Sequence, residues 1–255
     1  MAAQKAVDLN ADIGESFGAY TIGLDEELIK YITSANIACG LHAGDPLVME
    51  RTVALAAAHG VAVGAHPGYP DLQGFGRRDM SLSPAEVKAY VMYQVGALMA
   101  FARAAGVKLT HVKPHGALYN TAARDPRIAA AVVEAVKAVD EGLVLLALAG
   151  SEMVKAARAA GLAVAQEVFA DRAYHADGTL VPRGVPGAVI HDPEVAIPRA
   201  VRMVTEGKVR AITGEEIAIE ADSICVHGDN PRAVEFARRL KEALVAAGVL
   251  VRPLR

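Results

Sequence analysis

Near the N-terminus the chain reads Val7-Asp8-Leu9-Asn10-Ala11-Asp12-Ile13-Gly14-Glu15-Ser16, and we expect the rest of the chain to be arranged around this stretch. Alternation of apolar and polar residues predicts a strand, and the Gly and Ser after it predict a loop. On an extended backbone, Asp8, Asn10 and Asp12 point to one face. If that face lines a barrel or a cleft, these side chains form a site. The structural alternative is a solvated edge strand that ends in an Asx-type turn.

The composition favours one cytoplasmic α/β domain. The chain has 255 residues, of which 53% are hydrophobic, so we expect a single domain over residues 1–255. The net charge of −3, without a dominant basic patch, argues against nucleic acid as a partner. Apolar runs such as 143–149 are too short for a membrane span, and early acids interrupt any signal-peptide pattern. Cys39 and Cys225 lack CxxC spacing and are expected to be reduced thiols.

A repeated punctuation predicts where helices begin and end. An N-capping side chain precedes a proline at Asp45-Pro46, Asp125-Pro126, Asp192-Pro193 and Asn230-Pro231. A capping box adds a fifth helix start at Ser83-Pro84-Ala85-Glu86. The Ala-rich stretches mostly close on a glycine that suits the left-handed position after a helix, at Gly60, Gly106, Gly142 and Gly161.

Seven strands alternate with these helices, at Lys5–Asn10, Ala35–Cys39, Val61–Ala65, Leu109–Lys113, Leu143–Leu148, Ala163–Phe169 and Ser223–Val226. The alternation predicts a parallel sheet with right-handed crossovers. Periodicity leaves open whether the sheet closes into a barrel or stays doubly wound. Residues 177–190 predict a hairpin or flap, and residues 208–220 predict two short strands.

In either architecture the functional site lies at the C-terminal ends of the strands. Four of the eight histidines lie just past a strand, namely His42, His66, His115 and His227. A histidine accepts a proton near neutral pH, and a neighbouring carboxylate can fix its tautomer. Four such histidines with acids beside them favour a site over ordinary loop hydrogen bonding. We interpret His59, at a helix end, as structural.

Other polar residues leave several chemistries open. Lys113 and Arg172 could hold a substrate carboxylate or a developing anion. Helix capping is a sufficient explanation for Asp45. The loop 64–80, with two arginines and four glycines, could bind an anion, but it matches no phosphate-loop pattern, and a solvated surface loop explains it equally well.

Metal and thiol chemistry are weaker alternatives. Asp12, His42 and His66 would suit a divalent ion, although no HxxxH or HExxH motif marks a site, so the metal is left undecided. A thiol nucleophile at Cys39 or Cys225 is conceivable, but nothing in the sequence activates either residue.

Long motifs in the chain resemble the LamB/YcsF family, over nearly the whole length from about Val7 to Asp229. They are residues 8–15 (DLNADIGE), 34–45 (SANIACGLHAGD), 64–71 (GAHPGYPD) and 112–119 (VKPHGALY). That family comprises the A subunits of prokaryotic 5-oxoprolinases. The resemblance implies a seven-stranded β/α barrel of the glycoside hydrolase/deacetylase type. It also implies ATP-dependent hydrolytic opening of 5-oxo-L-proline to L-glutamate, with separate B and C subunits as partners.

Residue roles can be assigned against that reaction by residue type. Expected catalytic residues are Asp8, Asn10, Asp12, His66, Lys113 and His115. Expected substrate-binding residues are Glu15, His42, Asp45, Arg172, His227 and Asp229. Asp12 or His66 would serve as general base, Asp8 would orient it, and Lys113 or His115 would stabilise the oxyanion. Because no nucleotide motif is visible, ATP could bind this chain or one of its partners.

Two other functions stay open. One is a metal-dependent hydrolase, similar to the deacetylases, that acts on an amide or a sugar. The other is a non-catalytic subunit that scaffolds a partner enzyme. Convergent titratable groups argue against a scaffold, which needs none.

Overall fold

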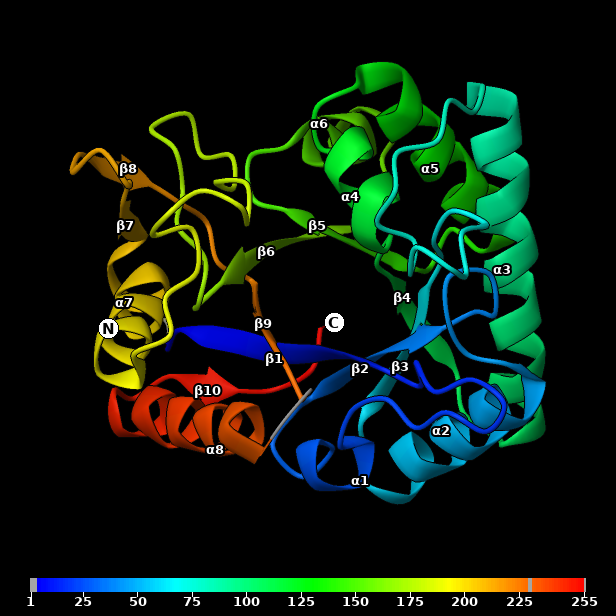
Figure 1. Cartoon of the computed structure of the whole chain (residues 1–255), viewed down its shortest axis with the longest axis horizontal. Coiled ribbons are helices and arrows are strands. Elements are labelled where there is room, and N and C mark those ends of the chain that lie inside the picture. Colours follow the sequence, from blue (N-terminus) through cyan, green and yellow to red (C-terminus); the bar gives the residue numbers. More distant parts are fainter. Residues whose placement is uncertain (1–3, 229–230, 255) are drawn as a thin grey trace.

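The computed structural model describes residues 4–228 and 231–254, and within them seven parallel strands close into a barrel (Figure 1). These strands are β1 (Ala6–Ile13), β2 (Ser34–Ala38), β3 (Ala62–His66), β4 (Leu109–Val112), β5 (Val144–Leu148), β6 (Val164–Phe169) and β9 (Ser223–Val226). Each strand pairs with the next in this order, and β9 pairs with β1, which closes the ring. The structure thus confirms the barrel and decides the question that periodicity left open.

Helices lie around the outside of the barrel (Figure 1). In chain order they are α1 (Asp25–Leu28), α2 (Pro46–Ala58), α3 (Pro84–Ala104), α4 (Gly116–Ala122), α5 (Pro126–Val139), α6 (Glu152–Ala159), α7 (Pro193–Glu206) and α8 (Pro231–Ala246). They bury the outward, apolar positions of the strands, for example Leu9, Ala11 and Ile37, in one continuous core.

The predicted helix starts are confirmed wherever the structure describes them. Asp45, Asp125 and Asp192 each accept a backbone N–H of the first turn, and Ser83 and Glu86 form the capping box. Asn230 lies outside the described residues. Among the glycines predicted to take the left-handed position after a helix, the prediction for Gly142 is wrong. This residue is absent from the positive-φ glycines, and α5 instead ends at the extended Asp140, whose side chain accepts the N–H of Gly142.

The predicted strands agree with the structure except at their ends. The largest difference is in β1, which continues to Ile13 rather than stopping at Asn10, so that Asp12 lies inside the strand. It continues because its pairing with β2 runs on through Asp12 and Ile13. The two short strands expected in residues 208–220 are β7 (Lys208–Arg210) and β8 (Glu216–Ala218), which pair antiparallel.

Residues 177–190 form a loop rather than a regular hairpin. Isolated antiparallel bridges join Arg172 to Val189 and Tyr174 to Leu180, and a small apolar cluster of Ala173, Val181 and Ala188 packs beneath them. The sequence did not predict β10 (Leu250–Val251), a two-residue strand that pairs in parallel with the start of β1.

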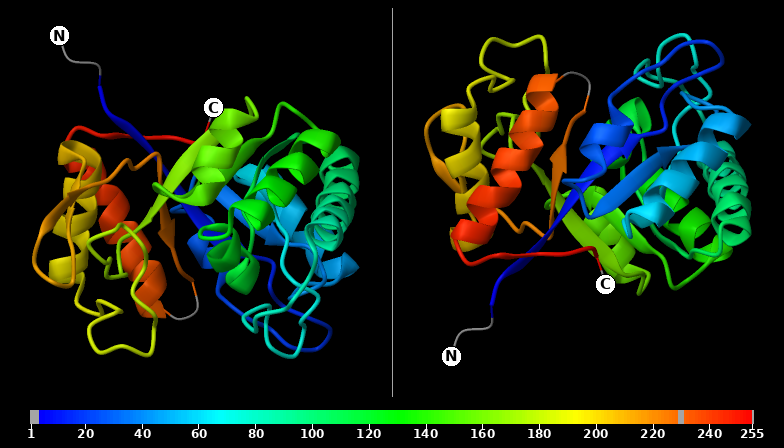
Figure 2. Two further views of the ribbon diagram at one scale, coloured as in Figure 1. Left: turned by 90° about the horizontal axis from the view of Figure 1, so that it is seen from above. Right: turned by 90° about the horizontal axis from the view of Figure 1, so that it is seen from below.

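The loops that follow β1, β3 and β6 gather at one end of the barrel (Figure 2). We call this end, where the strands finish, the upper end. The start of β1 and the last described residues, including β10, lie at the opposite, lower end (Figure 2). Strand β1 runs from the lower to the upper end, and its inward side chains meet different polar groups at the two ends.

Candidate functional site

A column of hydrogen-bonded polar side chains fills the barrel interior, and the inward face of β1 forms one side of it. At its lower end, Asp8 accepts hydrogen bonds from the hydroxyls of Thr33, Ser34 and Ser223. Ser34 lies on β2 and Ser223 on β9, so this carboxylate joins the three strands at the point where the barrel closes. The prediction that Asp8, Asn10 and Asp12 share one face is confirmed, and that face is the inside of the barrel.

The middle of the column links the lower and upper ends. Asn10 donates to Ser223 Oγ over 2.8 Å and accepts from Asn36 Nδ2 over 2.7 Å. Asn36 also donates to Asp12 Oδ1 over 2.9 Å, and its Oδ1 accepts from His111 Nε2 over 2.8 Å. Burial lowers the pKa of His111 to about 3, so this ring stays neutral. Every group here has a partner, which fixes the orientation of Asp12.

The ammonium of Lys113 lies between two carboxylates. Its Nζ is 3.0 Å from Asp12 Oδ1 and 2.7 Å from Glu167 Oε1, and it also donates to Asn10 Oδ1 over 3.1 Å. The other oxygen of Glu167 accepts from the hydroxyl of Tyr119 over 2.6 Å. Burial alone would lower the pKa of Lys113, but the two carboxylates outweigh it and raise the pKa well above its usual value. Lys113 is therefore a fixed positive charge.

Two histidines at the upper end have their tautomers set by backbone carbonyls. His66 Nδ1 is 2.7 Å from the carbonyl oxygen of Lys113, and His115 Nε2 is 2.8 Å from that of Phe75. A carbonyl only accepts, so each of these nitrogens carries the proton. The remaining nitrogens, His66 Nε2 and His115 Nδ1, face each other at 2.9 Å. In the neutral state, both present a lone pair to the same space.

His42 and Glu15 complete this group. The ring of His42 stacks on that of His115 with centroids 3.7 Å apart and an interplanar angle of 5°. Glu15 Oε1 is 3.4 Å from His42 Nε2 and 3.6 Å from His115 Nδ1. One ligand atom from each of Glu15, His42, His66 and His115 lies within 4.8 Å of the others, so these residues could hold a metal ion.

We call Asp12, Glu15, His42, His66, Lys113 and His115 the upper cluster. Burial and neighbouring charges shift the pKa values of its members in different directions. Burial would raise the pKa of Asp12, but the charges of His66 and Lys113 outweigh it and hold that pKa well below its usual value. Burial raises the pKa of Glu15, and the neighbouring charge of Asp12 adds to the effect. Burial also lowers the pKa of His42 and of His115. Asp12 is thus ionised, while these two histidines are neutral.

Glycines make room for the histidine rings. A Cβ at Gly76, where φ is +63°, would lie 2.7 Å from the Cβ of His42 and 2.8 Å from Cδ2 of His115. A Cβ at Gly64 would lie 2.1 Å from the ring of His111. The loop after β3 therefore packs against the upper cluster at Gly76, whereas Gly64, within β3, makes room for His111. The side chain of Arg78 in that loop is paired with Asp71.

Other predicted site residues have different surroundings. Asp45 caps α2 and also accepts the N–H of Gly18 over 2.8 Å. Arg172 donates to the carbonyl of Val181 over 2.6 Å and so braces the 177–190 loop. His227 lies 3.4 Å from Asp171, and both side chains are partly exposed. Asp229 lies outside the described residues. The substrate-binding roles expected of these residues stay predictions.

Three buried residues that contact the site are not among those expected from the sequence, namely Asn36, His111 and Glu167. All three occupy strand positions that point inward. Each is a polar side chain within a predicted strand, and that signal would have identified them once the barrel was known. Expected catalytic residues Asn10, Asp12, His66, Lys113 and His115 do come together, whereas Asp8 contacts hydroxyls at the lower end.

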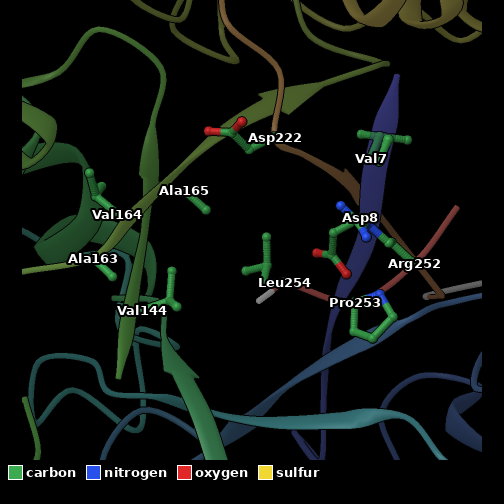
Figure 3. Close-up of a pocket in the computed structure, with 11 residues that line it drawn as sticks. Val7, Asp8, Val144, Ala163, Val164, Ala165, Asp222, Arg252, Pro253 and Leu254 are labelled. Atoms are coloured by element: carbon green, nitrogen blue, oxygen red, sulfur yellow. The ribbon is translucent and has the colours of Figure 1, made fainter. Parts of the chain in front are cut away.

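A cavity of about 240 Å³ lies at the lower end of the barrel (Figure 3). It is lined by residues that include Asp8, Val144, Ala165, Asp222, Arg252 and Leu254. One of its two acids, Asp8, already accepts three hydroxyl donors, and the other, Asp222, accepts the backbone N–H of Gln166. We therefore place the candidate site at the upper end, where polar groups remain without partners.

The model of the LamB/YcsF family matches residues 7–255. The chain belongs to the LamB/YcsF family. The resemblance noted in the sequence is thereby confirmed, and it covers both ends of the barrel. A relative from Alkaliphilus metalliredigens, whose name makes it the A subunit of 5-oxoprolinase, is 61% identical over 238 residues, which is 93% of each chain.

Solved structures agree with this membership. The LamB/YcsF barrel described here superimposes on a crystal structure of a lactam utilization protein from Thermus thermophilus, with a TM-score of 0.93. The two chains are 56% identical, and the match covers 98% of this chain and 100% of the other. A family 4 carbohydrate esterase from Streptomyces lividans, 12% identical, has a TM-score of 0.50 over 98% of this chain and 93% of its own. It shares the fold.

No helix among the described residues combines the length and the apolar character that a membrane crossing requires. Cys39 and Cys225 are both buried and unpaired, as expected of reduced thiols. Burial raises the pKa of the Cys39 thiol to about 12, so the thiol stays protonated. That protonation argues against Cys39 as a nucleophile.

Proposed function

We propose that this chain is the A subunit of a 5-oxoprolinase and that its upper cluster carries the hydrolytic step. The proposal rests on relatives of that name, which are about 60% identical over nearly the whole chain. The observation that carries it is the carboxylate of Asp12. It is ionised, 23% exposed, and held between Lys113 and His66.

The reaction adds water across one amide bond. The oxygen of water bonds to the ring carbonyl carbon of 5-oxo-L-proline, and the bond from that carbon to the ring nitrogen breaks. The nitrogen takes up a proton and becomes the amino group of L-glutamate, while the carbonyl carbon becomes its side-chain carboxylate. The chain must therefore activate water, stabilise an oxyanion and protonate a leaving nitrogen.

Asp12 suits the activation of water. Its Oδ1 is occupied by Lys113 and Asn36, while its Oδ2 lies 3.3 Å from His66 Nε2. Because the side chain is partly exposed, Oδ2 can accept a hydrogen bond from an incoming water and orient its lone pair. A positioned acid–base group of this kind contributes roughly 10²- to 10⁴-fold to a rate.

Lys113 suits the stabilisation of the oxyanion. A buried ammonium acts more strongly on a developing negative charge than an exposed one, because water does not screen it. Glu167, Asn10 and Asp12 fix its position. We propose that the substrate carboxylate is bound by His227, which lies beside Asp171, and by Arg172.

We assign the use of ATP to the assembled enzyme with its B and C subunits. A lactam is a poor electrophile. Transfer of the γ-phosphoryl group of ATP to its amide oxygen, with release of ADP, would activate the carbonyl carbon for attack by water, and the phosphate would leave as the carboxylate forms. No phosphate-loop pattern occurs in this sequence. The purified chain alone should therefore show little or no turnover.

A metal-dependent amide hydrolase is the second candidate, and the group of Glu15, His42, His66 and His115 favours it. ATP dependence separates the two, since such a hydrolase needs no ATP. A purely scaffolding subunit fits less well, because it has no use for convergent buried titratable groups.

The deciding experiment measures L-glutamate released from 5-oxo-L-proline, with and without ATP, by this chain alone and together with B and C subunits. The proposal expects release only from the assembled enzyme with ATP. ATP-independent hydrolysis of an amide by the chain alone would favour the second candidate. Full turnover by an assembly in which Asp12→Asn replaces the wild-type chain would refute a catalytic role for the upper cluster.

A further inference from the structure

We propose that Glu15, His42, His66 and His115 form a binding site for one divalent transition-metal ion of the zinc class. The four residues come from the loops and strand ends after β1, β2, β3 and β4, so the closed barrel brings them together. The inference does not depend on the reaction proposed above, and either can fail without the other.

The distances between the ligand atoms match the edges of a coordination shell. They are 2.9 Å between His66 Nε2 and His115 Nδ1, 3.4 Å between Glu15 Oε1 and His42 Nε2, and 3.6 Å between Glu15 Oε1 and His115 Nδ1. Bonds of about 2.0–2.1 Å to zinc place tetrahedral ligands about 3.3 Å apart. Four ligand atoms that merely happened to be neighbours would not need such spacing.

The tautomers of His66 and His115 also indicate a metal site. His66 and His115 each commit one N–H to a backbone carbonyl, of Lys113 and Phe75 respectively. When both rings are neutral, the two lone pairs that remain face each other, with carboxylates rather than donors around them. Metal-binding histidines are oriented in this way, by a carbonyl or carboxylate that accepts the proton of the other ring nitrogen.

His42 supplies an independent observation. Its side chain is fully buried, and among the described residues neither ring nitrogen has a hydrogen-bond partner. A buried polar group without a partner costs about 1–3 kcal/mol, which a bond from Nε2 to a metal would offset. A proton shared between His66 and His115 would satisfy those two rings, but it would leave His42 without a partner.

Charge and donor type select the ion. Three nitrogen donors and one carboxylate suit zinc and its neighbours in the first transition row, whereas magnesium and calcium prefer oxygen. When Asp12, Glu15 and Glu167 are ionised, they leave an excess of two negative charges over Lys113, which a divalent ion would balance. Bound here, the ion would act as a Lewis acid beside Asp12.

The test measures metal binding by the full-length chain and needs no catalytic assay. The purified chain is stripped with a chelator and titrated with Zn²⁺ by calorimetry and with Co²⁺ by visible absorption. Three variants are treated in the same way, namely His115→Ala, Glu15→Gln and, as the control, His59→Ala. His59 is a suitable control because it is exposed and its side chain is hydrogen-bonded to the carbonyl of Leu55, four residues earlier in the chain.

We expect one ion per wild-type chain, the same stoichiometry in His59→Ala, and affinity at least roughly 10-fold weaker in Glu15→Gln. His115→Ala should lose more, roughly 100-fold, since even the residues that only orient ligands cost 10- to 100-fold. If His115→Ala does not fold, Glu15→Gln decides, because it keeps the shape of the side chain. A folded wild-type chain that binds no ion, or binding equal in Glu15→Gln and wild type, would overturn the proposal.

Discussion

Asp8 and Asp12 lie four residues apart on the inward face of one strand, yet the structure gives them opposite surroundings. Asp8 is 2% exposed, and three hydroxyls donate to it. Asp12 is 23% exposed and is held by Lys113, by Asn36 and by the edge of His66. One carboxylate has all its partners inside the protein, whereas the other is partly exposed and has its second oxygen beside His66.

Asp8 and Asp12 share the inward face of β1, but their different partners give them different roles. Where neighbouring side chains satisfy a buried group, that group stabilises the fold. Where they fix a group but leave it an open direction, it can act on a substrate. The lower end of the barrel has a cavity without such groups (Figure 3). The upper end has such groups around the histidines.

The largest expected effect comes from Asp12→Asn, which removes the charge and keeps the shape. We expect turnover of the assembled enzyme to fall by roughly 10²-fold or more, the contribution of a positioned acid–base group. The melting temperature of the variant chain should stay close to that of the wild type. An unchanged rate would show that Asp12 has no catalytic role and does not differ from Asp8 in function.

Glu167→Gln should have the next largest effect on turnover. It leaves the ammonium of Lys113 with one carboxylate instead of two, so the ammonium is less firmly fixed. We expect kcat to fall by roughly 10-fold or more with little change in KM, because the ammonium acts on the developing oxyanion. Tyr119→Phe is the matched control, since it removes only the hydrogen bond to Glu167. An equal loss of kcat in both variants would show that the position of the Lys113 ammonium matters less than the packing around Glu167.

Asp8→Asn should change stability rather than chemistry. The amide turns one acceptor into a donor that faces the Ser223 hydroxyl, so about 1–2 kcal/mol of unfolding free energy should be lost. Burial raises the pKa of Asp8, so its contribution to stability is fully present below the pKa of the unfolded chain and falls as pH rises through the folded pKa. Chemical denaturation at several pH values checks this. A loss of turnover as large as that of Asp12→Asn, with an unchanged melt, would contradict the division between the two ends.

The smallest effect concerns Asp25, which accepts the backbone N–H of Gly14 at the end of β1. Burial raises its pKa to about 6, so the wild-type chain should lose stability as pH rises from about 4 through 6. Asp25→Asn keeps the hydrogen-bond acceptor but cannot ionise. We expect this variant to lack that pH dependence, measured by urea unfolding at about pH 4 and pH 7. Identical pH profiles would show that Asp25 is ionised in the folded chain at both pH values.

Much of the fold could be predicted because its signals are local. A capping residue followed by proline specifies a helix start from neighbouring atoms alone, and the described starts at Asp45, Ser83, Asp125 and Asp192 agree. Closure of the barrel could not be predicted from periodicity, because it depends on β9 returning to β1 from the far end of the chain. The two-residue β10 carries too little pattern to be recognised.

The site was predicted by residue type and needed the structure for its roles. Histidines after strands pointed to the upper end, and His42, His66 and His115 do meet there. Alternation along β1 could not separate Asp8 from Asp12, because their difference lies in partners on other strands. Glu167 was passed over for the same reason, since only the closed barrel brings it within 2.7 Å of Lys113.

A crystal structure of the chain with 5-oxo-L-proline would show which end of the barrel binds the ligand. We expect density for the lactam at the upper end, with its carbonyl oxygen toward Lys113 and its ring beside Asp12. Density in the lower cavity, between Asp8 and Arg252, with the upper cluster unchanged, would contradict this expectation.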